Sequence, residues 1–264
     1  MAFKLTLSGL LIYMVMAAYF SAFLLTVFRK EKAGRGLFLA GFLLALVAFG
    51  YRWQDVNHLP MQNLFEIFLT MGMIMYPLSM FCRWAFGSRG EAADALIGVI
   101  LLFPAGLVFD ANPQHLPPAL RCWLFGPHVA VYLLSYVVMI KAAVQASCQL
   151  ITRAGTDGIP SFDYEEVTYR LICLGFPLLT LGLILGSWWG KLAWGDYWAW
   201  DPKELWSLVS WLVYVEYLHF RSMFGKRLAR MNSCIAILGA VAIIITLLWV
   251  NLSRLFPGLH SYAN

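Results

Sequence analysis

Residues 186–211 read GSWWGKLAWGDYWAWDPKELWSLVSW, and they hold seven of the eleven tryptophans in the chain. The seven are Trp188, Trp189, Trp194, Trp198, Trp200, Trp206 and Trp211. An indole is a large, flat, apolar ring with one N–H, so a cluster of indoles suits a membrane–water boundary or a flat aromatic ligand. An interfacial belt explains a few of these residues. It does not explain so many in one connection, and both interpretations stay open at this point.

The end of this stretch has the signature of a helix start. Asp201 is a favourable N-cap, Pro202 fits the first helical position, and Glu204 stands where a capping box closes. We therefore interpret Asp201 and Glu204 first as helix caps. Such a cap matters for the tryptophans before it, because it fixes the direction in which they point.

The composition indicates a membrane protein. Of the 264 residues, 61% are hydrophobic and only 12% are charged. We predict an all-α, polytopic helical bundle that forms one integral-membrane domain over residues 1–264 and is surrounded by membrane lipid. The net charge of +5 is a signal of topology here, and we expect no nucleic-acid partner, because no basic patch is interleaved with base-stacking aromatic residues.

Eight apolar stretches are long enough to cross a bilayer, since a span needs about 20 residues and fewer where polar ends reach the interface. They are residues 5–28, 36–51, 64–81, 95–109, 129–150, 171–186, 205–220 and 233–250. One set of alternating loops carries twelve Lys or Arg residues, whereas the other set, with both termini, carries six. The positive-inside rule then predicts that both termini and a tryptophan loop at residues 186–204 are extracytoplasmic.

The histidines suggest what the tryptophans could hold. His58, His115, His128 and His260 lie in or beside outer loops, and only His219 lies at the inner end of a span. Haem is a flat, mostly apolar ring with two anionic propionates and an iron that accepts imidazole ligands. Tryptophans could cover the ring and histidines could close the axial positions. The alternative for any single histidine is a polar residue that caps the end of a span.

Other chemistry finds little support in the sequence. The five cysteines include no C-x-x-C pair, which argues against a thiol oxidoreductase and against a c-type cytochrome. The histidines and cysteines lack the spacing of a zinc site, and neither a phosphate-binding loop nor a serine nucleophile motif is present. Four basic side chains could neutralise haem propionates: Lys191, Lys203, Arg121 and Arg254.

Residues 194–204, WGDYWAWDPKE, resemble the WWD motif of haem-handling proteins in cytochrome c biogenesis. Three further segments resemble the histidine segments of that family: LFGPHV at 124–129, YLHFR at 217–221 and PGLHSYA at 257–263. The segment with His58, Asn63 and Glu66 resembles a further segment of that family. The resemblance covers the whole chain. It fits the CcsA (ResC) branch of the system II cytochrome c synthase better than the shorter, six-span CcmC branch of system I.

The resemblance implies a site and a reaction. His128 and His260 would be the axial ligands of haem b on the outer face, next to Trp188, Trp189, Trp194, Trp198, Trp200 and Asp201. His219 would ligate haem within the membrane, opposite a ligand from a CcsB (ResB)-like membrane partner. The synthase would join haem to both thiols of a C-x-x-C-H segment in apocytochrome c. We expect the incoming histidine of that segment to displace one protein ligand.

The resemblance also implies a location, which is the bacterial plasma membrane or a thylakoid membrane. The main alternative function is a CcmC-like haem exporter or chaperone that hands haem on without forming the bond. An electron-transfer cytochrome would need facing histidines inside the bundle, where only His219 lies. From its neighbours alone, His219 could be a polar helix end. His58 and Glu66 are first interpreted as a structural polar contact, and His115 as a loop residue.

Overall fold

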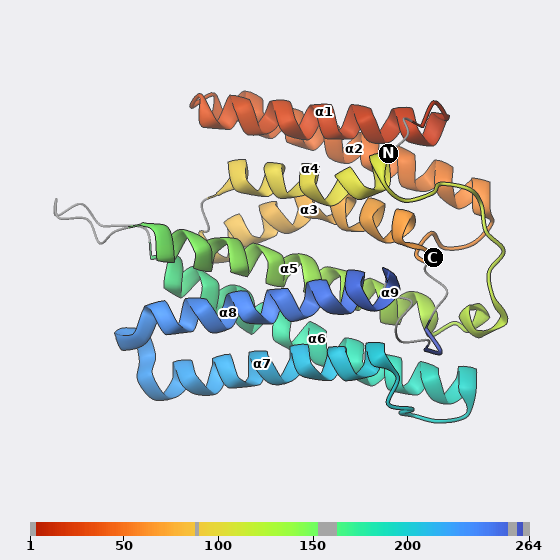
Figure 1. The fold of residues 1–264 in the computed structure, drawn as a ribbon. Helices are drawn as coiled ribbons and strands as arrows, with labels where there is room; N and C mark the ends of the chain where they lie inside the picture. The colour runs from red at the N-terminus through yellow and green to blue at the C-terminus, as the bar shows by residue number, and fades with distance from the viewer. Residues whose placement is uncertain (1–3, 88–89, 153–162, 253–257, 261–264) are drawn as a thin grey trace. The chain divides into compact units, whose positions relative to one another are not determined.

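The computed structural model describes residues 4–87, 90–152, 163–252 and 258–260 (Figure 1). Within these residues all regular structure is helical, which confirms the predicted all-α fold. The chain divides into two compact units, which comprise the described residues of 4–121 and of 122–260. The single domain over residues 1–264 stays a prediction.

The first unit contains four long helices and a short 3₁₀ turn (Figure 1). They are α1 (Leu7–Val27), α2 (Glu31–Val56), α3 (Leu64–Phe86), α4 (Glu91–Leu107) and η1 (Pro118–Arg121). Tyr19 of α1 contacts the other three long helices. Its buried ring meets the edge of Phe38 of α2, with the centroids 4.8 Å apart, and its hydroxyl donates to the carbonyl of Gly72 of α3 at 3.2 Å. A Cβ at Gly98 of α4 would lie 2.6 Å from that ring, so a glycine is needed there for the helices to approach.

The second unit contains the tryptophan-rich stretch. Its helices are α5 (Phe125–Ile151), α6 (Tyr164–Trp194), α7 (Pro202–Phe224), η2 (Gly225–Leu228), α8 (Ala229–Ile244), the π-helical turn η3 (Ile245–Trp249) and α9 (Val250–Leu252). After η2 the chain doubles back, so α7 and α8 run antiparallel (Figure 1). Two hydrogen bonds support the packing of this unit. Ser135 of α5 donates to the carbonyl of Gly175 at 2.9 Å, and Trp211 of α7 donates to Thr180 at 2.9 Å.

Each of the eight predicted stretches overlaps one of the helices α1–α8, although most of these helices extend beyond the predicted bounds. By length and composition, six helical segments among the described residues could cross a membrane. The difference from eight has two sources: α4 has only 17 residues, and α7 and α8 fall within one continuous segment of 51 residues, Pro202–Leu252. The chain is therefore a multi-pass membrane protein, whereas the count of eight and the side of each loop stay predictions.

The tryptophan-rich stretch begins as a helix, which corrects the predicted loop over residues 186–204. Residues 186–194 are the last turns of α6, and the non-helical connection covers only residues 195–201. The helix ends at Gly195, whose φ of +95° lies in the left-handed region that glycine tolerates. Lys191 in the last turn donates to the carbonyl of Gly195 at 2.5 Å. Hydropathy did not predict this extension. The mean hydropathy decreases at the first polar residues after residue 186, whereas the backbone hydrogen bonds of α6 continue to Trp194.

Candidate functional site

His128 lies in the first turn of α5, as predicted, and its ring is fixed against α6. Its Nδ1 lies 3.0 Å from the carbonyl oxygen of Gly182. A carbonyl can only accept a hydrogen bond, so Nδ1 of the imidazole carries the proton. The lone pair of the neutral ring is then on Nε2, which is the state of a histidine that can bind a metal.

A groove of small residues on α6 receives this ring. A Cβ at Gly186 would lie 2.5 Å from Cε1 of His128, and a Cβ at Gly182 would lie 3.0 Å from the ring of Tyr132. The two glycines are four residues apart, as are His128 and Tyr132, so one face of α5 fits one face of α6. This groove was not predicted, although Gly182 and Gly186 form a G-x-x-x-G pattern, which indicates close helix packing in an apolar helix.

His260 is held at its ring and on both sides of its backbone. Its Nδ1 lies 3.0 Å from Oδ1 of Asp201, and the other oxygen of that carboxylate accepts from the backbone N–H of Leu259 at 2.5 Å. The side chain of Lys203 donates to the carbonyl of His260 at 3.0 Å. Because the carboxylate accepts, the Nδ1 of His260 also carries a proton, and its Nε2 carries the lone pair when the ring is neutral.

Asp201 therefore has two tasks. It is the N-cap of α7 and accepts from the backbone N–H of Lys203 at 2.9 Å, while Glu204 closes the capping box, which confirms the predicted cap. Burial alone would raise the pKa of the Asp201 carboxyl, but the hydrogen bond and charge of His260, with two backbone N–H groups, hold that pKa below its ordinary value. A Cβ at Gly258 would lie 2.2 Å from Oδ2 of Asp201, so this approach of the chain to the cap requires glycine.

Two tryptophans at the end of α6 contact the imidazoles. Trp189 is buried, and its ring stacks on His128 with centroids 5.7 Å apart and planes 16° apart. The same indole lies 5.5 Å from the ring of His260. Trp194 meets Trp189 at 4.6 Å and His260 at 4.7 Å. The structure thus gathers both outer histidines of the predicted site around one indole.

Two other tryptophans of the stretch, Trp188 and Trp200, are exposed. Trp188 is 46% exposed and meets the edge of Trp123 at 5.8 Å. Trp198 and Trp200 also meet edge to face, with centroids 6.0 Å apart. Of the predicted haem-covering tryptophans, Trp189 and Trp194 contact the imidazoles, whereas Trp188 pairs with Trp123 and Trp198 pairs with Trp200.

Trp200 has an unusual backbone. Its φ of +57° lies in the left-handed region, which is rare for an aromatic residue, and its side chain is 66% exposed. One carboxylate oxygen of Glu204 accepts from the N–H groups on either side, of Ala199 at 2.8 Å and of Asp201 at 3.1 Å. The capping box thus fixes Trp200 in this conformation.

His219 stands apart from the outer histidines. It lies on an exposed part of α7, fifteen residues after Glu204, or about 22 Å along the helix. Its Nδ1 donates to the carbonyl of Val215 at 3.1 Å, which leaves the lone pair on Nε2. Its neighbour Arg221 pairs with the buried Glu165 of α6 at 2.5 Å.

The basic residues proposed for propionates have different surroundings. Lys203 already donates to His260, and Lys191 donates to Gly195 and lies over the ring of Tyr197 at 5.4 Å. Arg121 belongs to the first unit, where it donates to the carbonyl of Leu116 at 3.1 Å. Arg254 lies outside the described residues.

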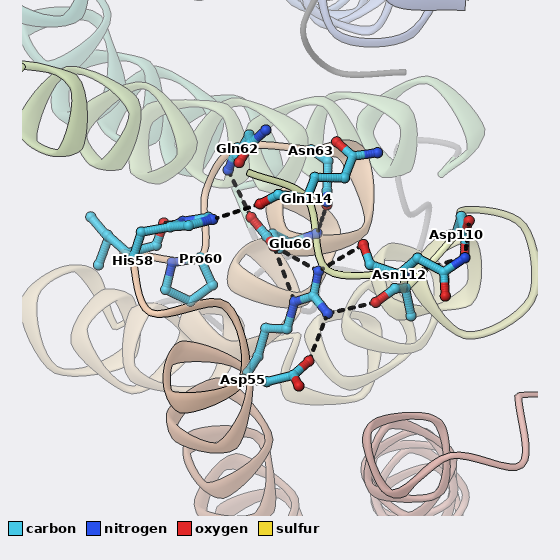
Figure 2. Close-up of polar contacts among 12 residues, drawn as sticks. Asp55, His58, Pro60, Gln62, Asn63, Glu66, Asp110, Asn112 and Gln114 are labelled. Atoms are coloured by element: carbon cyan, nitrogen blue, oxygen red, sulfur yellow. Dashed lines mark hydrogen bonds and ion pairs between the residues drawn. The ribbon is translucent and has the colours of Figure 1, made fainter. Parts of the chain in front are cut away.

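The first unit contains a separate polar cluster, which we name the Arg52 cluster (Figure 2). Glu66 of α3 accepts from Nη2 and Nε of Arg52 at 2.9 and 3.0 Å, and both side chains are 1% exposed. Arg52 also contacts the carboxylate of Asp55 at 3.2 Å and donates to the carbonyl of Ala111 at 2.5 Å. The second oxygen of Glu66 accepts from the backbone N–H of Gln62 at 2.8 Å. The structural contact predicted for Glu66 is confirmed, whereas its partner Arg52 was not predicted.

His58 and His115 lie beside this cluster. Nδ1 of His58 lies 3.0 Å from the carbonyl of Leu59, and its Nε2 lies 3.4 Å from that of Gln114 (Figure 2). His58 thus makes structural polar contacts, as was predicted. His115 is an exposed loop residue whose carbonyl accepts from the side chain of Gln62 at 3.2 Å.

Comparisons with known proteins agree with one family. The model of the cytochrome c assembly protein family matches residues 7–257. The cytochrome c biogenesis protein CcsA of Synechococcus sp. (strain RCC307) is 32% identical over 261 residues, which cover 86% of this chain and 83% of that protein. CcsA of Guillardia theta is 32% identical over 277 residues, which cover 89% and 88%.

A solved structure shares the fold. The cytochrome c heme lyase CcmF superposes with a TM-score of 0.67 and 20% identity over 94% of this chain and 48% of its own chain, so this chain spans about half its length. The family model and the CcsA relatives cover most of the chain at about one-third identity. This multi-pass membrane protein therefore belongs to the cytochrome c assembly protein family, in its CcsA branch, and its role lies in cytochrome c biogenesis.

Proposed function

We propose that the chain binds haem b through His128 and His260 and presents it for covalent attachment to apocytochrome c. The observation that carries this proposal is the pair of imidazoles around Trp189. Each ring donates from Nδ1 to a fixed acceptor and keeps its lone pair on Nε2. Iron-ligating histidines have this arrangement, in which the second nitrogen is oriented by a carbonyl or a carboxylate.

The residues around the imidazoles fit a flat aromatic ligand. Trp189 and Trp194 offer apolar surface against the two rings, and Trp188, Trp198 and Trp200 supply further aromatic surface in the same stretch. Lys203, which donates to the carbonyl of His260, and Lys191, in the last turn of α6, supply positive charge that would stabilise propionates.

Covalent attachment mainly requires that the vinyl groups of haem are held close to the cysteine thiols. Haem supplies two vinyl groups, and each cysteine thiol of the C-x-x-C-H segment adds across one of them, with sulfur and hydrogen going to the two vinyl carbons. No oxidant is consumed. The chain holds the ring edge within reach of the thiols and limits side oxidation.

A CcsB-like membrane protein is the proposed partner. His219 is exposed on α7 with its lone pair on Nε2, so the opposite ligand of a haem in the membrane would come from another chain. The proposed location is a bacterial plasma membrane or a thylakoid membrane, with the tryptophan-rich stretch outside, which is supported by the excess of Lys and Arg in the other loops.

The test is co-expression of the chain with a CcsB-like partner and an apocytochrome, followed by measurement of the haem that stays attached to the cytochrome after denaturation. We expect thioether-bound haem, a loss of at least about tenfold in His128→Ala and His260→Ala, and partial recovery with added imidazole. His115→Ala is the matched control and should resemble the wild type. Haem on the chain but none bound covalently would favour the alternative, a CcmC-like haem exporter or chaperone.

A further inference from the structure

We propose that the two imidazoles are unequal iron donors: His260 is the ligand that is retained, and His128 is the ligand that yields to an incoming imidazole. This inference rests on the proposed function, because it assigns different roles to the two residues of that site. It follows from the different acceptors that the two rings meet.

The acceptor of His260 is a carboxylate, whereas that of His128 is a peptide carbonyl. Both Nδ1–acceptor distances are 3.0 Å, so distance does not distinguish them. A hydrogen bond to an ionised acceptor is about twice as strong as one between neutral groups. The carboxylate draws the Nδ1 proton and moves electron density toward Nε2, which makes the imidazole a stronger donor to a metal. A neutral carbonyl, such as that of Gly182, increases the electron density at Nε2 less.

The surroundings of His260 also hold it more firmly. One carboxylate, that of Asp201, binds the ring of His260 and the N–H of the preceding residue, and Lys203 binds the carbonyl of His260. Asp201 is itself fixed as the N-cap of α7. The ring of His260, its carbonyl, the N–H of Leu259 and the start of α7 are therefore linked by hydrogen bonds, which resist displacement of His260.

Two indoles near His128 are exposed. Trp123, five residues earlier, is 68% exposed. Trp188, two residues after the Gly186 that touches the His128 ring, is 46% exposed and meets Trp123 edge to face. An extended segment of an apocytochrome could approach along these two indoles. Exchange of His128 for the incoming histidine replaces one neutral imidazole lone pair by another, so it requires neither an electron nor a net proton.

Asp201 is then a positioning residue, which acts on the iron through His260. Its cap and its charge can be separated by substitution. Asn is as good an N-cap as Asp, so Asp201→Asn keeps the start of α7 while it removes the negative charge beside His260. Asp201→Ala removes both.

The experiment uses the full chain purified with its bound haem, and three quantities are measured: haem content, the reduction potential of the haem, and the rate at which carbon monoxide binds to the ferrous form. Carbon monoxide reports ligand dissociation, because it binds to a six-coordinate iron only after an axial ligand has left. The variants are His128→Ala, His260→Ala and Asp201→Asn, and thermal unfolding verifies that each is folded.

We expect His128→Ala to keep most of its haem and to bind carbon monoxide at least about tenfold faster, whereas His260→Ala loses most of its haem. In Asp201→Asn we expect about 10- to 100-fold weaker retention of haem and a higher reduction potential, since a weaker donor stabilises ferric iron less. A purely structural role of Asp201 would leave the potential of the folded Asn variant unchanged.

Three results would overturn the proposal while the proposed haem site would stand. The first is better haem retention in His260→Ala than in His128→Ala, and the second is an equal loss in these two variants. The third is an unchanged reduction potential in Asp201→Asn. Unchanged haem in both variants would instead refute the proposed function itself.

Discussion

The Arg52 cluster and the two imidazoles are both polar groups within apolar bundles, but they use their hydrogen bonds differently. Arg52 donates to Glu66, Asp55 and a backbone carbonyl, and both oxygens of Glu66 accept. The charged groups of Arg52 and Glu66 are thus hydrogen-bonded to partners within the cluster. His128 and His260 instead donate from Nδ1 and direct a lone pair elsewhere. Burial of polar groups therefore does not mark a site by itself, whereas an oriented imidazole lone pair does.

The largest expected effect is on the Arg52 cluster. Glu66→Leu leaves the guanidinium of Arg52 buried without its main partner, and removal of one member of a buried ion pair costs about 3–5 kcal/mol. Thermal and denaturant unfolding in detergent would measure the loss. His58→Ala is the matched control and should cost less than about 1 kcal/mol, since it removes only one neutral hydrogen bond. A Glu66→Leu protein as stable as the wild type would contradict this comparison, because the Arg52 cluster would then not stabilise the fold.

The second prediction concerns the groove for His128. In Gly186→Ala the new Cβ would meet Cε1 of His128 at 2.5 Å, so the ring must shift. We expect overpacking to cost about 1–3 kcal/mol and carbon monoxide to bind the ferrous haem about tenfold faster, because the His128 ring loses its orienting contact. Gly50→Ala is the control, because its Cβ would meet nothing within 4 Å. Equal rates of carbon monoxide binding in the two variants would contradict the role of the groove.

A smaller effect is expected for the capping box. Glu204→Ala frees the two N–H groups that fix Trp200 in its left-handed conformation. Loss of a cap costs about 0.5–2 kcal/mol, and unfolding measurements would detect it. Glu204→Gln keeps an acceptor oxygen and should recover most of the stability. If the Gln variant is as unstable as the Ala variant, the charge of Glu204 and not its capping geometry is what matters.

The smallest effect is expected in acid, at the other end of α6. The pKa of Asp163 is lowered: burial opposes the shift, but the hydrogen bond and charge of Lys226 outweigh it. A carboxyl with a lower pKa in the folded state stabilises the fold above its unfolded pKa and loses that contribution as the pH falls below about 4. This pair is about half exposed, so Asp163→Asn should change the acid limb of stability by less than about 1 kcal/mol. A steeper change would show that exposed pairs matter here as much as the Arg52 cluster.

Local signals in the sequence predicted much of the site. The Asp201-Pro202-Lys203-Glu204 pattern predicted the start of α7 and its capping box, which the structure confirms, because capping depends on neighbouring residues. The position of His128 at the start of α5 follows from where apolar residues begin. The contact of Asp201 with His260 could not be derived in this way, since it joins residues 59 positions apart.

Other features depend on packing between helices. The extension of α6 to Trp194 is determined by a glycine cap and not by hydropathy. The partner of Glu66 could have been sought among nearby cations, because a carboxylate within a span needs one, and Arg52 stands at the end of the preceding predicted span. The fit of His128 against Gly186 requires knowledge of which helices are neighbours.

The most direct test of the central claim is the absorption spectrum of the purified chain, with and without a CcsB-like partner, in the wild type and in His128→Ala, His260→Ala and His115→Ala. Haem held by the two imidazoles predicts a Soret band that changes in His128→Ala but keeps most of its strength, weakens strongly in His260→Ala and is unchanged in His115→Ala. A band of equal strength in all four proteins, or the absence of haem from every preparation, would contradict the account and return the tryptophans to the role of an interfacial belt.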